Sequence, residues 1–227
     1  MSILPKNIST KVKIHTVYKL ASGEKVPGAT TVLGEIAKPA LIHWAWKLGI
    51  EGKDYKVFRD ELAEVGTLAH KMILAHLKDE TLCQDDYTAN QIGLAENCFL
   101  KYLEWERQHK IEPISVEEPM VSETWRYGGT ADFFGNIDGL LTVMDFKTGK
   151  GIYEDYWYQL AAYGELIREV TNVSNIHSYR ILNIGRDETE NFIEEQRGQL
   201  VKEFDIFTAA LKIYQLKKEV KRGVTYA

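Results

Sequence analysis

Two apolar segments joined by an Asp-Gly dipeptide constrain the fold of this chain more than any other feature. Residues 128–136 (GGTADFFGN) and 140–148 (LLTVMDFKT) contain the aromatic and β-branched residues that are typical of strands. Asp138-Gly139 between them is a strong signal for a tight hairpin turn. The sequence therefore predicts two antiparallel strands that lie about 5 Å apart.

The remainder of the chain alternates between helical and strand patterns. The predicted helices cover 39–49, 59–77, 88–108 and 153–170, and the other predicted strands cover 114–123, 176–185 and, as short segments, 11–33. From Leu200 to Tyr214 the apolar residues are spaced 4, 3, 4 and 3 apart, which predicts a long amphipathic helix. Trp44 and Trp46 are expected to be packing anchors.

This order of elements predicts an α/β fold, in which a central mixed β-sheet has helices on both faces. A length of 227 residues suits a single domain. Within it, residues 1–110 would form N-terminal strands and helices, and residues 111–227 would form the sheet core and the C-terminal helix.

Charge and composition narrow the class of protein. The formal net charge of −5 gives no global basic surface, although a local basic patch would be enough to bind a nucleic acid. The two cysteines, Cys83 and Cys98, cannot supply a four-thiolate zinc or iron–sulfur site, and we expect reduced structural thiols. Neither the apolar core of a signal peptide nor a run long enough to span a membrane is apparent, which predicts a soluble, cytoplasmic protein.

The predicted hairpin carries two acids that could share a site. Asp132 lies on the first strand and Asp145 on the second, so pairing of the strands could bring their carboxylates together. Converging carboxylates repel each other unless a cation neutralises them, and Mg²⁺ accepts such oxygen ligands. Lys147 shares a strand face with Asp145 and could orient an attacking water or stabilise developing negative charge. The alternative is a surface ion pair between Asp145 and Lys147, worth about 0–1 kcal/mol.

Residues outside the hairpin could extend this site. Gln159 and Tyr163 share one helix face and could contact a phosphate or a nucleobase, or be a core tyrosine with a neighbouring glutamine. His70 lies beside an apolar helix stripe, as a satisfied core residue or as a metal ligand. Gly66, one turn earlier, suggests that another segment approaches the helix closely. Glu117 is either solvated or completes an acidic cluster.

Taken in order, these residues resemble the RecB-type nuclease domain of the PD-(D/E)XK superfamily. The matching motifs are GxxxH (66–70), Glu117, GTAD (129–132), DFKT (145–148) and QxxxY (159–163). The resemblance covers about residues 28–170 and is strongest to the stand-alone phage-type and mitochondrial genome maintenance exonuclease branches. No single motif is specific, but the full set in this order is a strong signal.

The resemblance implies a restriction-endonuclease-like α/β/α core with an N-terminal, mainly helical extension. It further implies that Asp132, Asp145, His70 and the backbone carbonyl of Phe146 bind Mg²⁺ or Mn²⁺. Lys147 would position the attacking water, with help from Glu117. The remaining substrate contacts would come from Gln159, Tyr163, Thr148, Lys150 and Arg126, with a wider basic patch from Lys38, Lys47 and Arg59.

The resemblance thus predicts a metal-dependent deoxyribonuclease, and an exonuclease in particular, encoded by a virus or a bacterium and acting in DNA recombination or repair. Ala131 replaces the motif proline, and the cysteine count excludes the iron–sulfur cluster of some relatives. Trp44, Trp46 and Trp125 could stack unpaired bases. The alternatives are a catalytically silent DNA-binding or assembly module, a structure-specific endonuclease, or a small-molecule hydrolase. Homo-oligomers and partner proteins of recombination or replication are compatible with the resemblance.

Overall fold

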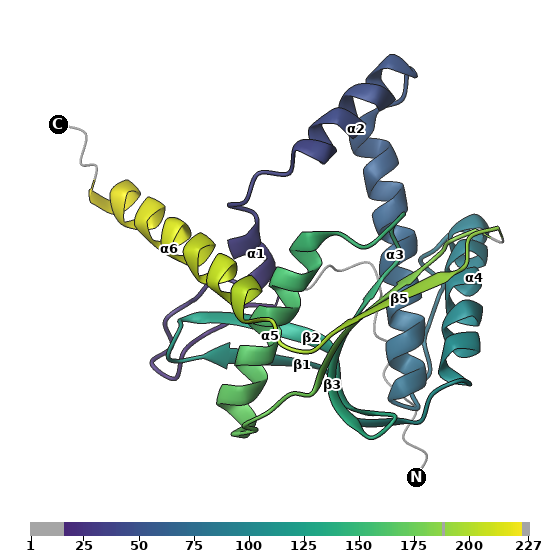
Figure 1. Ribbon diagram of the computed structural model, residues 1–227. Coiled ribbons are helices and arrows are strands. Elements are labelled where there is room, and N and C mark those ends of the chain that lie inside the picture. The colour runs from purple at the N-terminus through teal and green to yellow at the C-terminus, as the bar shows by residue number, and fades with distance from the viewer. Residues whose placement is uncertain (1–15, 188, 224–227) are drawn as a thin grey trace, which may run out of the picture.

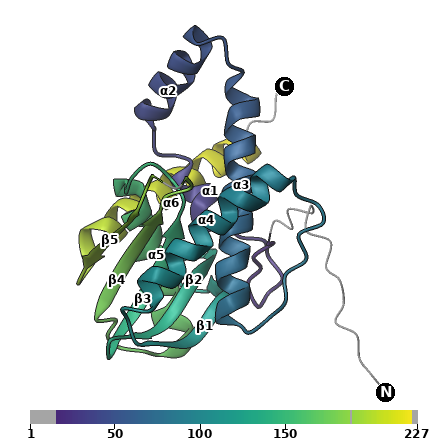
Figure 2. The ribbon, with the colours of Figure 1, turned by 90° about the vertical axis from the view of Figure 1, so that its right-hand side faces the viewer.

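Three layers, helix, sheet and helix, build the part of the chain that this computed structural model describes, residues 16–187 and 189–223 (Figures 1 and 2). The central sheet has five strands in the order β1-β2-β3-β4-β5. Their bounds are β1 (Ile111–Ser122), β2 (Tyr127–Ile137), β3 (Leu140–Lys147), β4 (Ser178–Ile184) and β5 (Phe192–Arg197). Pairing is antiparallel except between β3 and β4, which are parallel, so the sheet is mixed as predicted.

Helices cover both faces of this sheet. On one face lie α3 (Tyr55–Leu77) and α4 (Ala89–Glu106), and on the other lie α1 (Ala29–Leu33), α5 (Glu154–Thr171) and α6 (Val201–Gly223). The short helix α2 (Pro39–Ile50) projects beyond the sheet together with the start of α3 (Figure 1). The predicted α/β/α core with a mainly helical N-terminal part is therefore confirmed.

Alternation along β3 assigns its side chains to the two faces. Met144 and Phe146 are buried in the core beneath α3 and α4, whereas Val143 is buried in the core beneath α5. Because neighbouring side chains of a strand point to opposite faces, Asp145 and Lys147 lie on the α5 side with Val143. The candidate acids are thus carried on two interior strands of the sheet, β2 and β3.

Local signals in the sequence explain several boundaries. Asp138 and Gly139 both adopt positive φ, 54° and 79°, which is the conformation of a two-residue hairpin turn and confirms the predicted hairpin. The Asp54 side chain accepts hydrogen bonds from the first turn of α3, which begins four residues before the predicted start. Thr88 and Gln91 form a reciprocal capping box at the start of α4.

Other expectations were wrong. Residues 29–33 form helix α1 rather than a strand, because Ala29, Val32 and Leu33 pack against the sheet core. Before it, the described residues of the expected short strands form two isolated bridges, Lys19 with Lys25 and Gly28 with Gly128, and residues 11–15 lie outside the described part. Strand β5 was not predicted.

The side chain of Trp46 is not a packing anchor, because 61% of the residue is exposed on α2. Trp44 packs edge-on against Tyr55 and close to Phe58. Both cysteines are free, and Cys98 is buried as predicted. Among residues 16–187 and 189–223, no helix combines the length and the apolar character that a bilayer crossing requires.

Candidate active site

Asp132 and Asp145 stand opposite each other where the β2–β3 ladder ends. The last pair in the ladder is Phe133 with Met144, so the next positions along the two strands are Asp132 and Asp145. The amide of Phe146 no longer has a main-chain partner in β2, and it donates to Asp132 Oδ2 at 2.8 Å instead. A side-chain carboxylate thus replaces the next ladder bond, and the predicted approach of the two acids is found.

Asp145 begins a chain of polar contacts that leads to α5. Lys147 Nζ lies 2.6 Å from Asp145 Oδ2, and the Asp145 side chain is only 3% exposed. Lys147 Nζ also donates to Gln159 Oε1 at 3.1 Å, and Gln159 Nε2 donates to the hydroxyl of Tyr163 at 2.6 Å. Gln159 and Tyr163 therefore meet the acid–lysine pair, as their position on one helix face suggested.

His70 approaches the same point from the opposite layer. Its Nε2 contacts the carbonyl oxygen of Phe146 and lies 3.5 Å from Asp132 Oδ2. Helix α3 supplies this side chain, whereas β2 and β3 supply the other two groups. Three candidate metal ligands from distant parts of the sequence, His70 Nε2, Asp132 Oδ2 and the Phe146 carbonyl oxygen, therefore lie close together.

The environment shifts the pKa values of these groups in a consistent direction. Burial raises the pKa of Asp132 to about 6, and Asp145 adds to this rise while His70 and Lys147 oppose it. Burial acts to lower the pKa of Lys147, but the charges of Asp145 and Asp132 raise it overall. Burial also raises the pKa of Tyr163. When Asp132 and Asp145 are both ionised, their two negative charges thus exceed the one positive charge of Lys147.

Two glycines permit the close approaches on which the site depends. A Cβ on Gly66 would lie 2.7 Å from Thr148 Oγ1, so the glycine lets α3 approach the turn after β3, as predicted. A Cβ on Gly129 would lie 2.6 Å from the ring of Tyr163. The adjacent Gly128 makes room in the same way for the ring of Tyr18, whose hydroxyl bonds Thr130 Oγ1 at 2.9 Å.

Residues that the sequence analysis missed also shape the site. The amide of Asn183 on β4 pairs with both main-chain groups of Gly149, accepting at 3.1 Å and donating at 3.0 Å. It fixes the turn that follows Lys147. The signal available was a buried asparagine within an apolar strand. Tyr156 places its ring 4.7 Å from Lys147 Nζ, a cation–π contact whose partner only the fold reveals.

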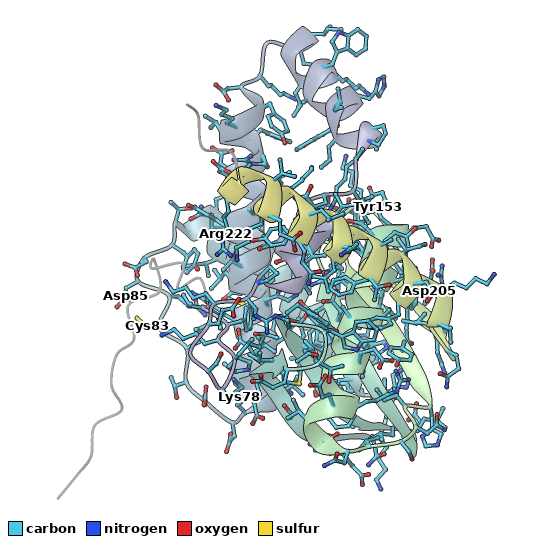
Figure 3. All side chains as sticks on the ribbon, turned by 90° about the vertical axis from the view of Figure 1, so that its left-hand side faces the viewer. Lys78, Cys83, Asp85, Tyr153, Asp205 and Arg222 are labelled. Carbon is cyan, nitrogen blue, oxygen red and sulfur yellow. The ribbon has the colours of Figure 1, made fainter. Side chains whose placement is uncertain are left out.

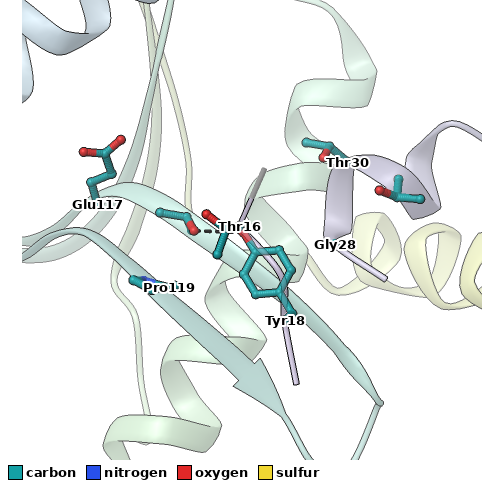
Figure 4. A pocket seen from close by; sticks show the side chains of 8 residues that line it. Thr16, Tyr18, Gly28, Thr30, Glu117 and Pro119 are labelled. Carbon is teal, nitrogen blue, oxygen red and sulfur yellow. Dashed lines mark hydrogen bonds between the residues drawn. The ribbon is translucent and has the colours of Figure 1, made fainter. Parts of the chain in front are cut away.

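Glu117 lies at the edge of the site rather than in it. It is opposite Asp132 in the β1–β2 register, but its φ is 54° and its side chain is 50% exposed. Lys78 lies 3.5 Å from its carboxylate. Glu117 and Thr130 line a pocket of about 570 Å³ with hydroxyl-rich walls, shown in Figure 4 with Tyr18, Thr30 and Pro119.

The structure does not bring the expected basic residues into one patch. Lys150 is exposed in the turn after β3, next to the site. Arg126 pairs with Glu24 at 2.5 Å and lies just before β2, six residues ahead of Asp132, which is about 20 Å at the rise of a strand. The other basic residues are Lys38, which pairs with Asp155, Arg59, which pairs with Asp60, and Lys47, which is exposed on α2.

The donor set is of the kind that fits a hard divalent cation. Asp145 Oδ2 is buried, and Lys147 Nζ contacts it at 2.6 Å. Among the described residues, no three His, Cys, Asp or Glu side chains already form a metal-binding group. The donors that do lie together are Asp132, His70 and the main-chain oxygen of Phe146, with Asp145 adjacent.

Comparisons with known proteins find similarity among solved structures. No protein-family model matches the sequence, and no curated protein matches it. Among solved structures, the chain is similar to an alkaline exonuclease, LHK-Exo, from Laribacter hongkongensis, with 12% identity over 71% of this chain and 91% of that chain and a TM-score of 0.32. The complex of LHK-Exo with dAMP matches at 12% identity over 71% of this chain and 88% of that chain, with a TM-score of 0.31. Since TM-scores this low do not establish a common fold, function is inferred from the residues of the site.

Proposed function

We propose that this protein is a metal-dependent deoxyribonuclease, and specifically an exonuclease that hydrolyses phosphodiester bonds of linear or single-stranded DNA. The observation that supports this most is the buried Asp145 carboxylate, which lies on the strand next to that of Asp132 at the adjoining register position and has Lys147 Nζ at 2.6 Å. One buried and one partly buried acid beside one lysine are costly for stability and suit phosphoryl chemistry. The enzyme would process DNA ends during recombination or repair.

Each residue of the site has a distinct role in this proposal. Asp132, Asp145, His70 and the Phe146 carbonyl hold Mg²⁺ or Mn²⁺. A bound divalent ion would supply charge for the phosphodiester oxygens and lower the pKa of water. Lys147 holds the attacking water in line with the scissile phosphate, and its contacts with Asp145 and Gln159 fix the position of Nζ.

The substrate would pass the side of the site formed by α5 and the turn after β3. Gln159 and Tyr163 would contact the DNA backbone, as would Thr148 and the exposed Lys150. Glu117 would assist from the edge of the sheet. Because phosphate contacts release counterions, DNA binding should weaken as salt is added.

Incubation of linear and circular DNA with Mg²⁺, Mn²⁺ or EDTA tests the proposal. Wild type is compared with Asp145→Ala and with the matched control Asp205→Ala, whose carboxylate is exposed on α6. We expect linear DNA to be degraded only with metal, and only by wild type and the control. Activity that survives in EDTA or in Asp145→Ala would refute the metal site.

The same assay separates the alternatives. Cleavage of circles would identify an endonuclease. Salt-sensitive DNA binding without cleavage under any metal would identify a silent binding or assembly module. Hydrolysis of a small phosphodiester without DNA affinity would identify a small-molecule hydrolase.

A further inference from the structure

The solvent-facing side of α6 carries a second apolar stripe, distinct from the one that packs on the sheet. Its exposed members are spaced 3, 4, 3 and 4 residues apart and are Ile206, Ala209, Ile213, Leu216 and Val220. Leu216 is 44% exposed, Ile213 47% and Val220 64%. Figure 3 shows α6 crossing one face of the molecule, with Asp205 toward one end and Arg222 toward the other.

This stripe is not needed for the packing of the monomer. The buried residues of α6 are Phe207, Ala210 and Leu211, which face the sheet core and α5. At 3.6 residues per turn, the stripe from Ile206 to Val220 lies roughly on the opposite side of the helix. Burying exposed large aliphatic side chains is favourable by about 25 cal/mol per Å² of apolar surface. Covering this face of α6 with a binding partner would therefore lower the free energy.

The spacing of the stripe identifies the kind of partner. Apolar residues that alternate at intervals of 3 and 4 form the seam by which one helix packs along another helix. We propose that α6 pairs in antiparallel orientation with α6 of a second copy of this chain, about a two-fold axis between Tyr214 and Gln215. Ile213 then packs on Leu216 of the second copy, and Ala209 packs on its Val220.

Charge beside the seam selects the antiparallel orientation. Lys212 and Glu219 flank the stripe on the same side, and neither forms an ion pair within the described part of the chain. In the antiparallel pair, Lys212 of each copy lies opposite Glu219 of the other, which gives two complementary contacts. In a parallel pair, Lys212 would lie opposite Lys217 of the other copy. The parallel pair would also bring together the two basic C-terminal turns.

The placement of α6 leaves room for this arrangement. Figure 1 shows its C-terminal half extending beyond the sheet, where Lys217 pairs with Glu35 in the segment after α1. Antiparallel pairing therefore places the sheet and remaining helices of the second copy beyond the C-terminal end of α6 of the first copy, and not against the sheet of the first copy. One helix pair is a smaller interface than the roughly 1,200–2,000 Å² typical of stable complexes, so a concentration-dependent equilibrium is expected.

Sedimentation equilibrium of the full chain from about 1 to 300 µM tests the proposal. Wild type should pass from monomer to dimer, and Ile213→Glu should remain monomeric because it places two charges in the seam. Lys212→Glu and Glu219→Lys should each dimerise about tenfold more weakly. An equimolar mixture of these two variants should recover dimers, because both cross-contacts then pair opposite charges. Lys56→Glu, an exposed charge reversal on α3, is the matched control and should behave as wild type.

Four results would overturn the proposal. A wild type that stays monomeric throughout would show that no second copy occupies this face. A dimer that tolerates Ile213→Glu would lie elsewhere on the molecule. A dimer strengthened by Lys212→Glu, or a mixture with no gain, would exclude the antiparallel pairing. Circular dichroism melting of each variant establishes that the monomer remains folded.

Discussion

Asp132 accepts a hydrogen bond from the amide of Phe146 at the position where β2 and β3 stop pairing. The bond places a partly buried acid across from Asp145 and near His70, and burial raises the pKa of Asp132 to about 6. Since the unfolded chain would ionise this carboxyl near 3.8, folding favours its protonated form. The charge on Asp132 thus costs stability above its folded pKa, unless a cation compensates it.

The variant Asp132→Asn should therefore gain stability relative to wild type as pH rises. With EDTA present, the difference should grow between about pH 4 and 6 and then level off near 3 kcal/mol or less, since 1.36 kcal/mol corresponds to one pKa unit. The asparagine can still accept from the Phe146 amide, so the fold is kept. Urea unfolding across this pH range measures the effect, with Asp205→Asn as a control that should show no such trend. A variant less stable than wild type at pH 8 would contradict the expectation.

Replacement of Gly66 by alanine should reduce activity without the stability gain that alanine usually brings to a helix. Its Cβ would lie 2.7 Å from Thr148 Oγ1 and displace the turn after β3. Gly93→Ala on α4 is the matched control, because nothing lies within 4 Å of its new Cβ, and it should stabilise by about 1 kcal/mol. Adding Thr148→Ala should restore that gain to Gly66→Ala. Equal melting temperatures for Gly66→Ala and Gly93→Ala would argue against the close approach.

Asn183→Ala should lower stability and weaken substrate binding together. The change removes two hydrogen bonds to Gly149, at a cost of about 1–3 kcal/mol. The released turn would no longer present Thr148 and Lys150 to a DNA backbone, so KM for DNA should rise more than kcat falls. Asn90→Ala on the exposed start of α4 serves as the control. An unchanged KM would show that the turn makes no contact with substrate.

Trp46→Ala should leave stability within about 0.5 kcal/mol of wild type, because the residue is mostly exposed. If bases stack on this ring, affinity for single-stranded DNA should fall by roughly 5- to 150-fold, the equivalent of 1–3 kcal/mol. Fluorescence anisotropy with a labelled oligonucleotide measures it. Trp125→Ala is the contrast: its ring packs edge-on against Phe204 at 5.2 Å, and it should lose stability instead. If Trp46→Ala bound single-stranded DNA with unchanged affinity, stacking of bases on Trp46 would be excluded.

Much of the fold could be predicted from local sequence patterns, because tertiary packing agrees with them. The Asp138-Gly139 turn and the alternation of β3 predicted the hairpin, and the hairpin placed Asp132 opposite Asp145. Helix α1 was missed because Thr30, Thr31 and Val32 favour strands, and only packing against the sheet core makes them helical. Strand β5 was missed because its polar, charged sequence suits a sheet edge, where pairing with β4 stabilises it.

The site could be predicted only where its residues followed a pattern along the chain. Asp145 with Lys147, and Gln159 with Tyr163, share a face through strand or helix periodicity, and the structure joins the two pairs through Lys147 and Gln159. Tyr156 and Asn183 contribute through contacts between elements, which no spacing indicates. Arg126 was expected near the substrate, but the direction of β2 carries it away from Asp132.

The two adjacent glycines of β2 have a consequence for folding fidelity. Gly128 and Gly129 admit the rings of Tyr18 and Tyr163 on opposite sides of one strand. A slip of the strand by one residue would present Tyr127 or Thr130 where one of these rings must pass, and both faces would be mismatched at once. The glycine pair thus disfavours alternative strand registers. It favours the register in which Asp132 lies opposite Asp145.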